Sequence, residues 1–410
     1  MPQPSVPPRR LPPLRITAYT TTTAAGPGKA ALLSALRSGK SALRANDFGP
    51  SPLATWIGRV AGVESQALPK PLADWDCRNN RLAWLGLLAD DFIDAAHAAR
   101  ERYGAARVAL VLGTSTSSIG ATEDAYRALD GEGRFPPDNR NPLVHTPHSL
   151  TRFVREALAL EGPSVTVSTA CSSSAKVFAA AERMLRLGLV DAAIVGGVDT
   201  LCGSVLFGFN ALQLVSPDPC RPFDAGRSGI SIGEAAGFAL LERAAGARAG
   251  DGLALLGYGE SSDAHHMSTP HPEGLGAERA LDDALARAGA DASEIDHVNL
   301  HGTASHKNDE VEAALVARRF PARTHAVSTK GFTGHTLGAA GIVEAAASLL
   351  AIEHGFLPGM AGTRTLDPAC GPQIRIEPSR GEVRLALSNS FGFGGNNCVL
   401  VLGRSAGARA

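Results

Sequence analysis

The sequence lacks the features of several large protein classes. Its 39 lysines and arginines nearly balance its 40 aspartates and glutamates, and the formal net charge of -1 argues against a surface that binds nucleic acid. No strongly apolar run reaches the roughly 18 residues that a membrane span needs. The proline-rich start, residues 1–13, is followed by no apolar run that could serve as a signal peptide, so secretion is not supported.

Cysteine is also scarce. The six cysteines include no CxxC pair, a distribution typical of reduced thiols in a cytoplasmic protein and not of a disulfide framework. They are Cys77, Cys171, Cys202, Cys220, Cys370 and Cys398. We therefore expect a cytoplasmic protein that contains free thiols.

What the sequence does contain is a regular alternation of buried strands and helices. With 410 residues, 44% of them hydrophobic and 19% charged, the chain can bury a large core as one big domain or two fused ones. Residues 164–168 and 192–195 are predicted strands that flank a helix at 172–187, and together they form a βαβ unit with Cys171 at the helix entrance. Other first-half elements are strands at 14–19 and 105–113 and helices at 28–39 and 81–102.

The second half repeats this theme. Its predicted strands are 297–300, 326–328, 384–388 and 398–402, and its predicted helices are 309–319 and 337–354. Such alternation predicts an α/β protein with mostly parallel sheets covered by helices. The small, charged and flexible residues 245–252 indicate a boundary. The chain then divides into a flexible tail at 1–13, a first half at 14–250 and a second half at 251–410.

Cys171 is the first candidate for chemistry. It lies in STACSSSA, at a strand-to-helix turn of small residues, where the positive end of the helix dipole favours a thiolate. A lone cysteine among alanines is more often a small core residue. The accessible backbone and the helix entrance favour the functional interpretation here.

Two histidines occupy similar positions. His301 follows an apolar strand in HGTASHKND, and His335 lies in the glycine-rich turn of KGFTGHTLGAAG. Either histidine alone is more often a surface or hydrogen-bonded core residue. The ends of parallel strands meet at one crevice, however. A thiol and two imidazoles in that crevice suit covalent acyl transfer, in which the thiolate holds an acyl thioester and neutral imidazoles donate to a developing oxyanion.

Two loops complete the candidate site. Residues 389–397, NSFGFGGNN, are a glycine-rich hairpin whose loop can supply a backbone N–H to an oxyanion and a mobile Phe393 to a tunnel mouth. Residues 261–274 hold three close histidines, but their spacing matches no helical HxxxH pair, so we expect no metal site. We expect this second loop to line the substrate pocket, with His266 and Ser268 as substrate-binding residues.

Six motifs in order carry a family resemblance. They are TACSSSA, RPFDAGRSGISIGEAAG, SDAHHM, HGTASHKND, KGFTGHTLGAAG and NSFGFGGNN. From about residue 14 to residue 403, the chain resembles the β-ketoacyl-acyl carrier protein synthases of the I/II type. The resemblance implies the thiolase fold: two similar βα halves in five layers, αβαβα, and a dimer with active sites near its interface.

The resemblance also implies a role for each site residue. Cys171 would be the acylated nucleophile, and His301 and His335 would stabilise the enolate that forms when malonyl carrier protein loses carbon dioxide. The oxyanion of the following attack would lie between the N–H groups of Cys171 and Phe393. Lys330 and Glu344 would orient the histidines as a buried pair. Thr303 and Ser305 would bind the pantetheine arm, although the family usually has threonine at the second position.

The implied partners are an acyl carrier protein and a second, related subunit. The chain itself would bind no cofactor, because phosphopantetheine arrives on the carrier protein. Some relatives have a structural monovalent-cation site, and residues at similar spacings here are Asn299, Glu312, Glu344, Ser388 and Asn389. The dimer could be a homodimer or a heterodimer with a chain-length factor.

Alternatives remain open within and beyond this family. The segments after Cys171 and His301 are similar to ketosynthases of aryl polyene and type II polyketide pathways, rather than of fatty-acid elongation. A chain-length-factor-like, non-catalytic subunit is the main rival, although such subunits typically lack the cysteine. A degradative thiolase would need a second cysteine in a C-terminal CxG turn, and this chain has GFGGNNC there.

Overall fold

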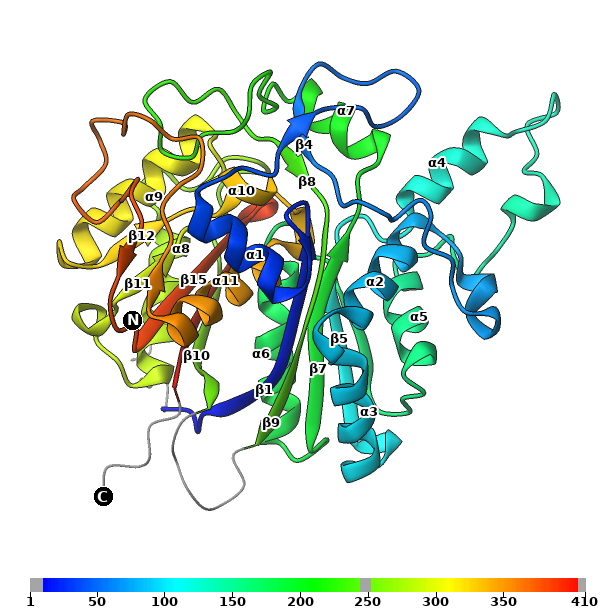
Figure 1. Cartoon of the computed structure of the whole chain (residues 1–410), viewed down its shortest axis with the longest axis horizontal. Coiled ribbons are helices and arrows are strands. Elements are labelled where there is room, and N and C mark those ends of the chain that lie inside the picture. The colour runs from blue at the N-terminus through cyan, green and yellow to red at the C-terminus, as the bar shows by residue number, and fades with distance from the viewer. Residues whose placement is uncertain (1–9, 244–251, 405–410) are drawn as a thin grey trace, which may run out of the picture.

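A computed structural model describes residues 10–243 and 252–404 (Figure 1). Ten strands lie in line in one hydrogen-bonded sheet, in the order β12-β11-β15-β16-β10-β1-β9-β7-β5-β6. In the first half these are β1 (Leu14–Thr23), β5 (Val108–Gly113), β6 (Ser164–Val167), β7 (Ala192–Asp199) and β9 (Ala235–Arg243). In the second half they are β10 (Leu253–Ser262), β11 (His297–Asn299), β12 (His325–Val327), β15 (Leu385–Gly392) and β16 (Asn396–Arg404).

The sheet consists of two halves with the same topology. From its outer edge inward, each half places its third, second, fourth, fifth and first strand: β6-β5-β7-β9-β1 in one and β12-β11-β15-β16-β10 in the other. The halves join where β1 pairs antiparallel with β10, at Leu14 with Leu255 and Arg15 with Ala254. The duplicated βα architecture expected from the sequence is therefore present.

The expectation of mostly parallel sheets is wrong. Among the ten strands in line in the described sheet, only the outer pairings β5–β6, β5–β7, β11–β12 and β11–β15 are parallel. The inner pairings, from β7–β9 across to β15–β16, are antiparallel. The reason is clearest at β15 and β16, because the three residues Phe393–Gly395 between them can close a hairpin but cannot make the long crossover that parallel strands need.

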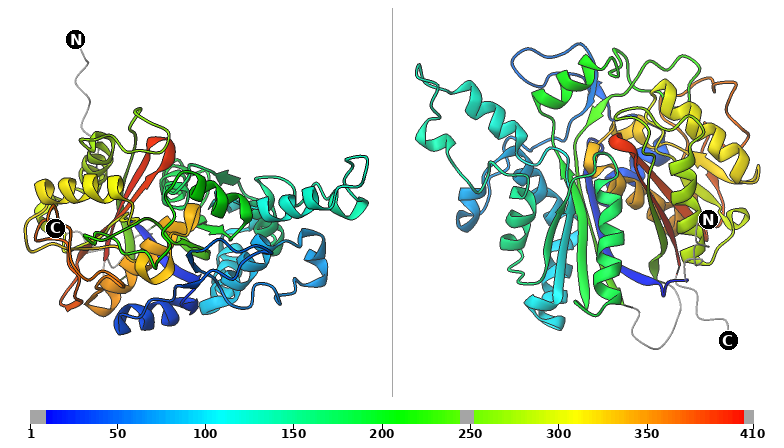
Figure 2. Two further views of the ribbon diagram at one scale, coloured as in Figure 1. Left: turned by 90° about the horizontal axis from the view of Figure 1, so that it is seen from above. Right: turned by 180° about the vertical axis from the view of Figure 1, so that it is seen from behind.

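Helices and half-sheets form five layers (Figure 2). Helices α2 (Arg78–Leu88), α3 (Phe92–Tyr103) and α5 (Ser149–Ala157) cover the outer face of the first half-sheet. Helices α8 (Leu275–Ala288) and α9 (His306–Arg319) lie on the outer side of the second, in one apolar cluster with its strands. Helices α6 (Ser173–Arg186) and α11 (Ala340–His354) pack on each other and on both half-sheets. The middle layer is thus enclosed by protein on both sides, and α1 (Gly28–Ser38) packs against β1 and α11.

The predicted helix at 81–102 is broken in two. Helices α2 and α3 are separated by a 3-10 turn, Ala89–Asp91, in which Asp90 and Asp91 both have φ of 56°. The Asp90 carboxylate accepts hydrogen bonds from the Thr20 hydroxyl at 2.8 Å and the Lys29 N–H at 2.9 Å. This tertiary contact to β1 and α1 stabilises a break that the apolar periodicity does not reveal.

Helix α11 is more completely buried than α6, the other helix of the middle layer. The stretch Leu337–His354 is long and apolar enough to cross a membrane by length and composition, yet 89% of it is buried inside the protein. A helix that is apolar on all sides is expected where protein surrounds it. Its apolar character therefore reflects its place between the two half-sheets.

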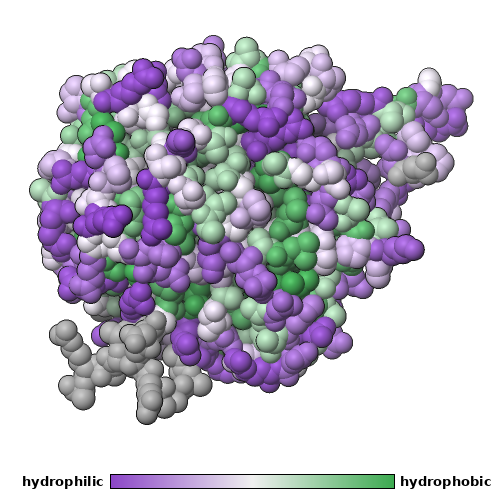
Figure 3. All heavy atoms as spheres, viewed as in Figure 1, coloured by the Kyte–Doolittle hydropathy of each residue, from purple (hydrophilic) through white to green (hydrophobic). Residues whose placement is uncertain are grey.

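The segment around α4 (Ile119–Arg127) projects away from these layers (Figures 1 and 2). The ring of Tyr126 packs edge-on against Phe135, with centroids 5.1 Å apart. Hydrophilic side chains cover most of the projection on the face shown in Figure 3, which is otherwise a mixture of polar and smaller apolar areas. The boundary predicted at 245–252 falls almost entirely on residues 244–251, outside the described residues, as does most of the predicted tail. The division into halves at residue 250 stays a prediction.

Helices α6 and α11 approach closely at their N-terminal ends, next to Cys171. A Cβ on Gly341 would lie 2.5 Å from the backbone nitrogen of Ala175. The Ile342 N–H donates to the Ser174 hydroxyl at 3.0 Å, which links the two helices directly. Glycine at position 341 is thus required by the contact between the halves.

We expect Gly341→Ala to destabilise the protein by about 1–3 kcal/mol, because the added methyl group must displace backbone. Gly208→Ala is the matched control, since Gly208 is also helical and its Cβ would meet nothing within 4 Å. The control should be neutral or stabilising by up to about 1 kcal/mol, from helix propensity. Urea unfolding of both variants measures this, and equal effects would contradict the packing argument.

Candidate active site

Cys171 lies in the turn between β6 and α6, and only 5% of it is exposed. The preceding residue, Ala170, has a left-handed backbone with φ of 52°. Serine hydroxyls support this strained turn: Ser173 donates to the Ala170 carbonyl at 2.6 Å, and Ser172 donates to the Thr169 carbonyl at 2.9 Å. The small polar residues around the cysteine therefore hold the turn that presents its sulfur.

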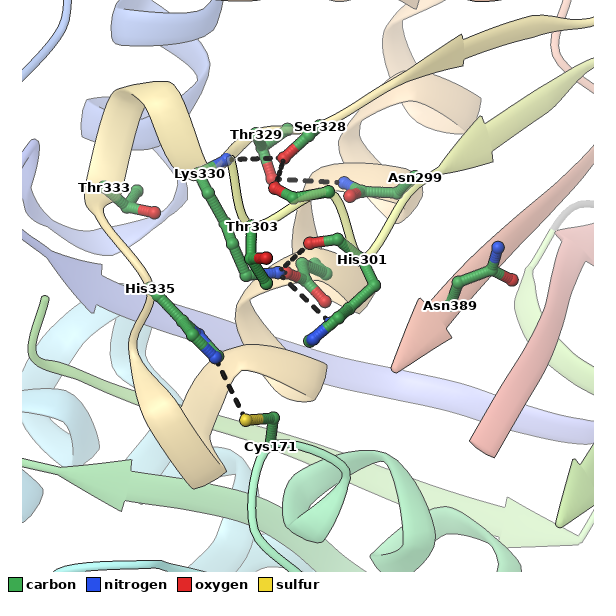
Figure 4. A network of polar contacts seen from close by, with 12 residues as sticks. Cys171, Asn299, His301, Thr303, Ser328, Thr329, Lys330, Thr333, His335 and Asn389 are labelled. Carbon is green, nitrogen blue, oxygen red and sulfur yellow. Dashed lines mark hydrogen bonds and ion pairs between the residues drawn. The ribbon is translucent and has the colours of Figure 1, made fainter. Parts of the chain in front are cut away.

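His335 lies beside the sulfur (Figure 4). Its Nε2 is 3.0 Å from Cys171 Sγ. The histidine follows the short helix α10 (Lys330–Thr333), and its backbone is fixed on both sides. Its N–H donates to the Ser231 carbonyl at 2.7 Å, and its carbonyl accepts from the Gly233 N–H at 2.9 Å. The ring position is thus set by these backbone hydrogen bonds, because His335 Nδ1 has no hydrogen-bond partner among the described residues.

His301 completes the cluster at the end of β11. The buried Glu312 of α9 accepts from the backbone N–H groups of His301 at 2.8 Å and Gly302 at 2.7 Å, which fixes the strand end. The ring is 5.5 Å from that of His335 and perpendicular to it. One ligand atom from each of Cys171, His301 and His335 lies within 4.8 Å of the others. The structure thus brings the three candidate residues together.

Lys330 and Glu344 form a buried ion pair behind the histidines, each side chain 2% exposed. The lysine Nζ also donates to the His301 carbonyl at 2.5 Å and lies 3.5 Å from His301 Nδ1. Glu344 comes from α11, so the pair connects the central helix to β11. Since a buried charge without a partner is costly, this pairing is what retains the ammonium group beside the imidazoles.

Burial controls the ionisation of the site. It lowers the pKa of His301 and of His335 well below the usual value, and the Lys330 charge lowers both further. It raises the pKa of Glu312 and of Glu344 to about 7. Both imidazoles are therefore neutral at physiological pH, as acyl-transfer chemistry requires.

The expectation of a resting thiolate is wrong. Burial raises the pKa of Cys171 to about 11. The Lys330 charge opposes the shift, as do the backbone N–H groups of Phe393 and Cys171 itself, but loss of hydration outweighs them. The resting pair is a neutral thiol next to a neutral imidazole.

Phe393 occupies the 3-10 turn between β15 and β16 and stacks on Phe209, with ring centroids 5.4 Å apart. Its backbone N–H and that of Cys171 both act on the Cys171 sulfur. Gly392 allows this approach, because a Cβ there would lie 2.9 Å from the Thr169 carbonyl. Phe209 was missed from the sequence, where only the apolar segment of α7 (Gly203–Ala211) could have suggested it.

The loop at 261–274 contacts the Phe393 turn. The Gly394 N–H donates to the Met267 carbonyl at 2.7 Å, and the backbone N–H of Asp263 donates to the Gly395 carbonyl at 2.9 Å. His266 is exposed, and its Nδ1 accepts from the backbone of Ser268 at 3.2 Å. The side-chain contacts found for His266 and Ser268 in the described part stay within this loop. Their role in substrate binding therefore stays a prediction.

Thr303 and Ser305 lie just beyond His301. Their hydroxyl groups are 2.9 Å apart, and the Thr303 N–H donates to Asp309 Oδ1 at 3.0 Å. Thr303 is 7% exposed, whereas Ser305 is half-buried at the start of α9. Two adjacent hydroxyls between the cluster and the surface suit the pantetheine role that the resemblance implies for them.

The Cys171, His301 and His335 donors are close enough to bind a metal ion. The Lys330 ammonium, 3.5 Å from His301 Nδ1, disfavours a divalent cation there.

A surface cavity of about 550 Å³ lies elsewhere, between α3, β1 and β9, with Ala99, Tyr103 and Glu242 in its lining. Tyr103 precedes the start of β5, whereas Cys171 follows the end of the parallel β6. The cavity and the thiol therefore lie at opposite ends of these strands.

The residues suggested for a monovalent cation fit such an ion. Four of them carry a buried oxygen without a hydrogen-bond partner among the described residues. These oxygens are Asn299 Oδ1, Glu344 Oε2, Ser388 Oγ and Asn389 Oδ1. The fifth residue, Glu312, accepts from Asn389 Nδ2 at 3.1 Å. Hard oxygen donors and a carboxylate are the ligands that such a cation would take.

Comparison with known proteins assigns the chain to a family. Residues 83–247 match the model described as "Beta-ketoacyl synthase, N-terminal domain", and residues 254–364 match "Beta-ketoacyl synthase, C-terminal domain". Nodulation protein E of Rhizobium meliloti (strain 1021) is 34% identical over 83% of this chain and 87% of its own length. In the same organism, 3-oxoacyl-[acyl-carrier-protein] synthase 2 is 40% identical over 60% of this chain and 62% of its own length.

A solved structure agrees with this assignment. A chain from the ketosynthase ApeO in complex with its chain length factor ApeC, from Xenorhabdus doucetiae, superposes with a TM-score of 0.87 and 37% identity. The match covers 96% of this chain and 98% of that chain. The thiolase fold expected from the sequence is thereby confirmed.

Alkylation of Cys171 by iodoacetamide should be slow at pH 7 and rise about tenfold for each pH unit towards pH 9, because only the thiolate reacts. With a pKa of about 11, the thiolate fraction at pH 7 is about 10⁻⁴. Peptide mass mapping follows Cys171 separately from the other cysteines, and Cys171→Ser should lose the adduct. A rate that is flat between pH 7 and pH 8 would instead indicate a thiolate–imidazolium pair.

The melting temperature should be a few degrees higher in potassium or sodium chloride than in the same concentration of tetramethylammonium chloride, because the cation binds only the folded state. Asn389→Leu should abolish the difference. Asn79→Leu is the matched control, since Asn79 is equally buried but lies in the first half. Identical melting of wild type in all three salts would exclude the site.

Proposed function

Because this chain belongs to the beta-ketoacyl synthase family, we propose that it is a catalytic ketosynthase that condenses an acyl group held on Cys171 with malonyl carrier protein. The observation that carries the proposal is the 3.0 Å separation of Cys171 Sγ and His335 Nε2, with His301 next to them. A thiol can act as the nucleophile in acyl transfer, and two neutral imidazoles can donate hydrogen bonds to the anion that forms before the carbon–carbon bond.

The first half-reaction is transfer of the acyl group to Cys171. The sulfur attacks the thioester of the incoming acyl carrier protein while its proton passes to His335 Nε2. The tetrahedral oxyanion takes the position facing the N–H groups of Cys171 and Phe393, where preorganised donors are worth a few kcal/mol. Collapse of the intermediate expels the pantetheine thiolate, which takes up the proton, so that one thioester replaces another.

The second half-reaction joins two carbons. Malonyl carrier protein loses carbon dioxide, and the resulting enolate oxygen accepts hydrogen bonds from the ring N–H groups of His301 and His335. For His335 this is the Nε2–H tautomer, which proton exchange with water restores after the first half-reaction. The Lys330 ammonium, behind His301, favours this negative charge. The enolate carbon then attacks the Cys171 thioester, and the product leaves as a β-ketoacyl group on the carrier protein while the Cys171 thiolate takes up a proton from water.

The main rival is a non-catalytic subunit that only shapes a partner's tunnel. The presence of Cys171, His301 and His335 in one cluster favours the catalytic role.

The structure of a ketosynthase with its chain length factor supports a heterodimer as one assembly, and a homodimer is the alternative. We expect the complex to act in the cytoplasm on acyl carrier proteins. The motif resemblance favours an aryl polyene or polyketide-type pathway over fatty-acid elongation.

The test is acyl loading, followed by intact-protein mass spectrometry. Wild type and Cys171→Ala are incubated with saturated, polyene and aryl-primed acyl carrier proteins. We expect the mass of one acyl group on wild type and none on Cys171→Ala. Cys398→Ala is the matched control, because Cys398 is also fully buried but lies in β16, and this variant should load normally.

Malonyl carrier protein is then added to the loaded enzyme. His301→Ala and His335→Ala should retain some loading but lose condensation by 100-fold or more. The acyl group loaded fastest distinguishes the polyene from the fatty-acid pathway. If wild type loads no donor, alone or with a purified chain-length factor, the catalytic proposal is wrong and the non-catalytic subunit is favoured.

A further inference from the structure

Asp199, at the end of β7, is a fully buried carboxylate outside the Cys171 cluster, with no exposed surface. In the described part of the chain its hydrogen-bond donors are all neutral, either hydroxyl or backbone N–H groups. A buried carboxylate held without a cation is costly to retain. This free-energy cost of burial indicates that the hydrogen bonds of Asp199 have a role that an apolar side chain could not fill.

The first set of donors comes from the loop after β5. Oδ1 accepts from the hydroxyl groups of Thr114 and Thr116, each at 2.7 Å, and from the Thr116 N–H, also at 2.7 Å. The Ser115 N–H donates to both carboxylate oxygens, at 2.8 and 3.0 Å. Three consecutive residues are therefore fixed by one side chain.

This loop touches the nucleophile turn. Ser115 donates its hydroxyl to the Ala170 carbonyl at 3.3 Å, and the Thr114 N–H donates to the Val167 carbonyl at 3.0 Å. Val167 ends β6, and Ala170 is the left-handed residue directly before Cys171. The position of the Cys171 backbone thus depends on the loop that Asp199 holds.

The second set of contacts reaches the turn after His335. Oδ2 accepts from the Ala339 N–H at 3.1 Å. A Cβ on Gly338 would lie 2.7 Å from the same oxygen, so the turn passes directly over the carboxylate. Leu337, two residues after His335, has φ of 56°, and the turn therefore needs an external contact to keep its shape.

We propose that Asp199 is a positioning residue that sets the separation of Cys171 and His335 by holding both of their turns on one carboxylate. The inference rests on the proposed function, since it concerns the reaction of that pair. The two turns belong to different halves of the chain, and the carboxylate is a short connection between them. A displacement of about 1 Å between reacting groups can cost about 100-fold in rate.

A buried carboxylate that only stabilises the fold provides the matched control. Glu182 of α6 is 3% exposed, accepts from Tyr258 at 3.0 Å and pairs with Arg186 at 3.1 Å. It has no contact with either turn in the described structure. Glu182→Gln should lower stability while leaving the rate of condensation within about twofold of wild type.

The decisive variant is Asp199→Asn, which replaces one acceptor oxygen by an N–H₂ group that faces N–H donors. We expect condensation to fall 10- to 100-fold, with the Michaelis constant for acyl carrier protein changed less than twofold. We also expect a changed pH profile of Cys171 alkylation, because the sulfur no longer lies at the same distance from His335. A purely structural role would move only the melting temperature.

Thr116 provides a milder test if Asp199→Asn does not fold. Thr116→Val removes one hydroxyl donor at constant shape and should reduce condensation, whereas Thr116→Ser keeps the donor and should restore it. If wild type condenses acyl groups but Asp199→Asn and Thr116→Val match Glu182→Gln in rate and pH profile, the positioning role is wrong. If wild type itself does not load or condense, it is the proposed function that fails.

Discussion

One buried positive charge organises the centre of this protein. The Lys330 ammonium has to be paired because it is almost fully enclosed, and Glu344 of α11 provides the pair. The same ammonium holds the His301 carbonyl, and it adds to the effect of burial, which lowers the pKa of both histidines so that they stay neutral. The arrangement requires a carboxylate on a helix whose other buried residues are all apolar except Ser348, and therefore a middle layer protected by both half-sheets.

The duplicated topology explains why the reactive groups meet. In each half, loops follow the carboxyl ends of the parallel outer strands, β5–β6 in one half and β11–β12 in the other. The first half contributes Cys171 and the second contributes His301 and His335. Contacts between the halves, at Gly341 against Ala175 and at Asp199 with Ala339, then determine distances that neither half can set alone.

Two expectations failed for one common reason, which is that tertiary contacts outweighed a local tendency. The helix at 81–102 breaks where Asp90 bonds to β1 and α1, although the apolar stripe continues through it. The antiparallel inner strands have a different cause, because the short connection between β15 and β16 is itself a local feature that permits only a hairpin. Cys171 lies at a helix entrance that favours a thiolate, but burial raises its pKa to about 11. Burial depends on the whole fold and cannot be read from neighbouring residues.

The sequence by itself indicated the α/β class, most element positions and three candidate side chains, because hydrophobic periodicity and glycine-rich turns are local properties. The thiolase fold and the roles of those side chains came from the family resemblance. Only the tertiary structure decided how those side chains relate: the 3.0 Å contact of Cys171 with His335, their ionisation, and the stacking of Phe209 on Phe393. The carboxylate of Asp199, at the end of an ordinary apolar strand, had no local signal at all. Its hydrogen bonds join segments that are far apart in the sequence, and the sequence alone does not show that these segments are close in space.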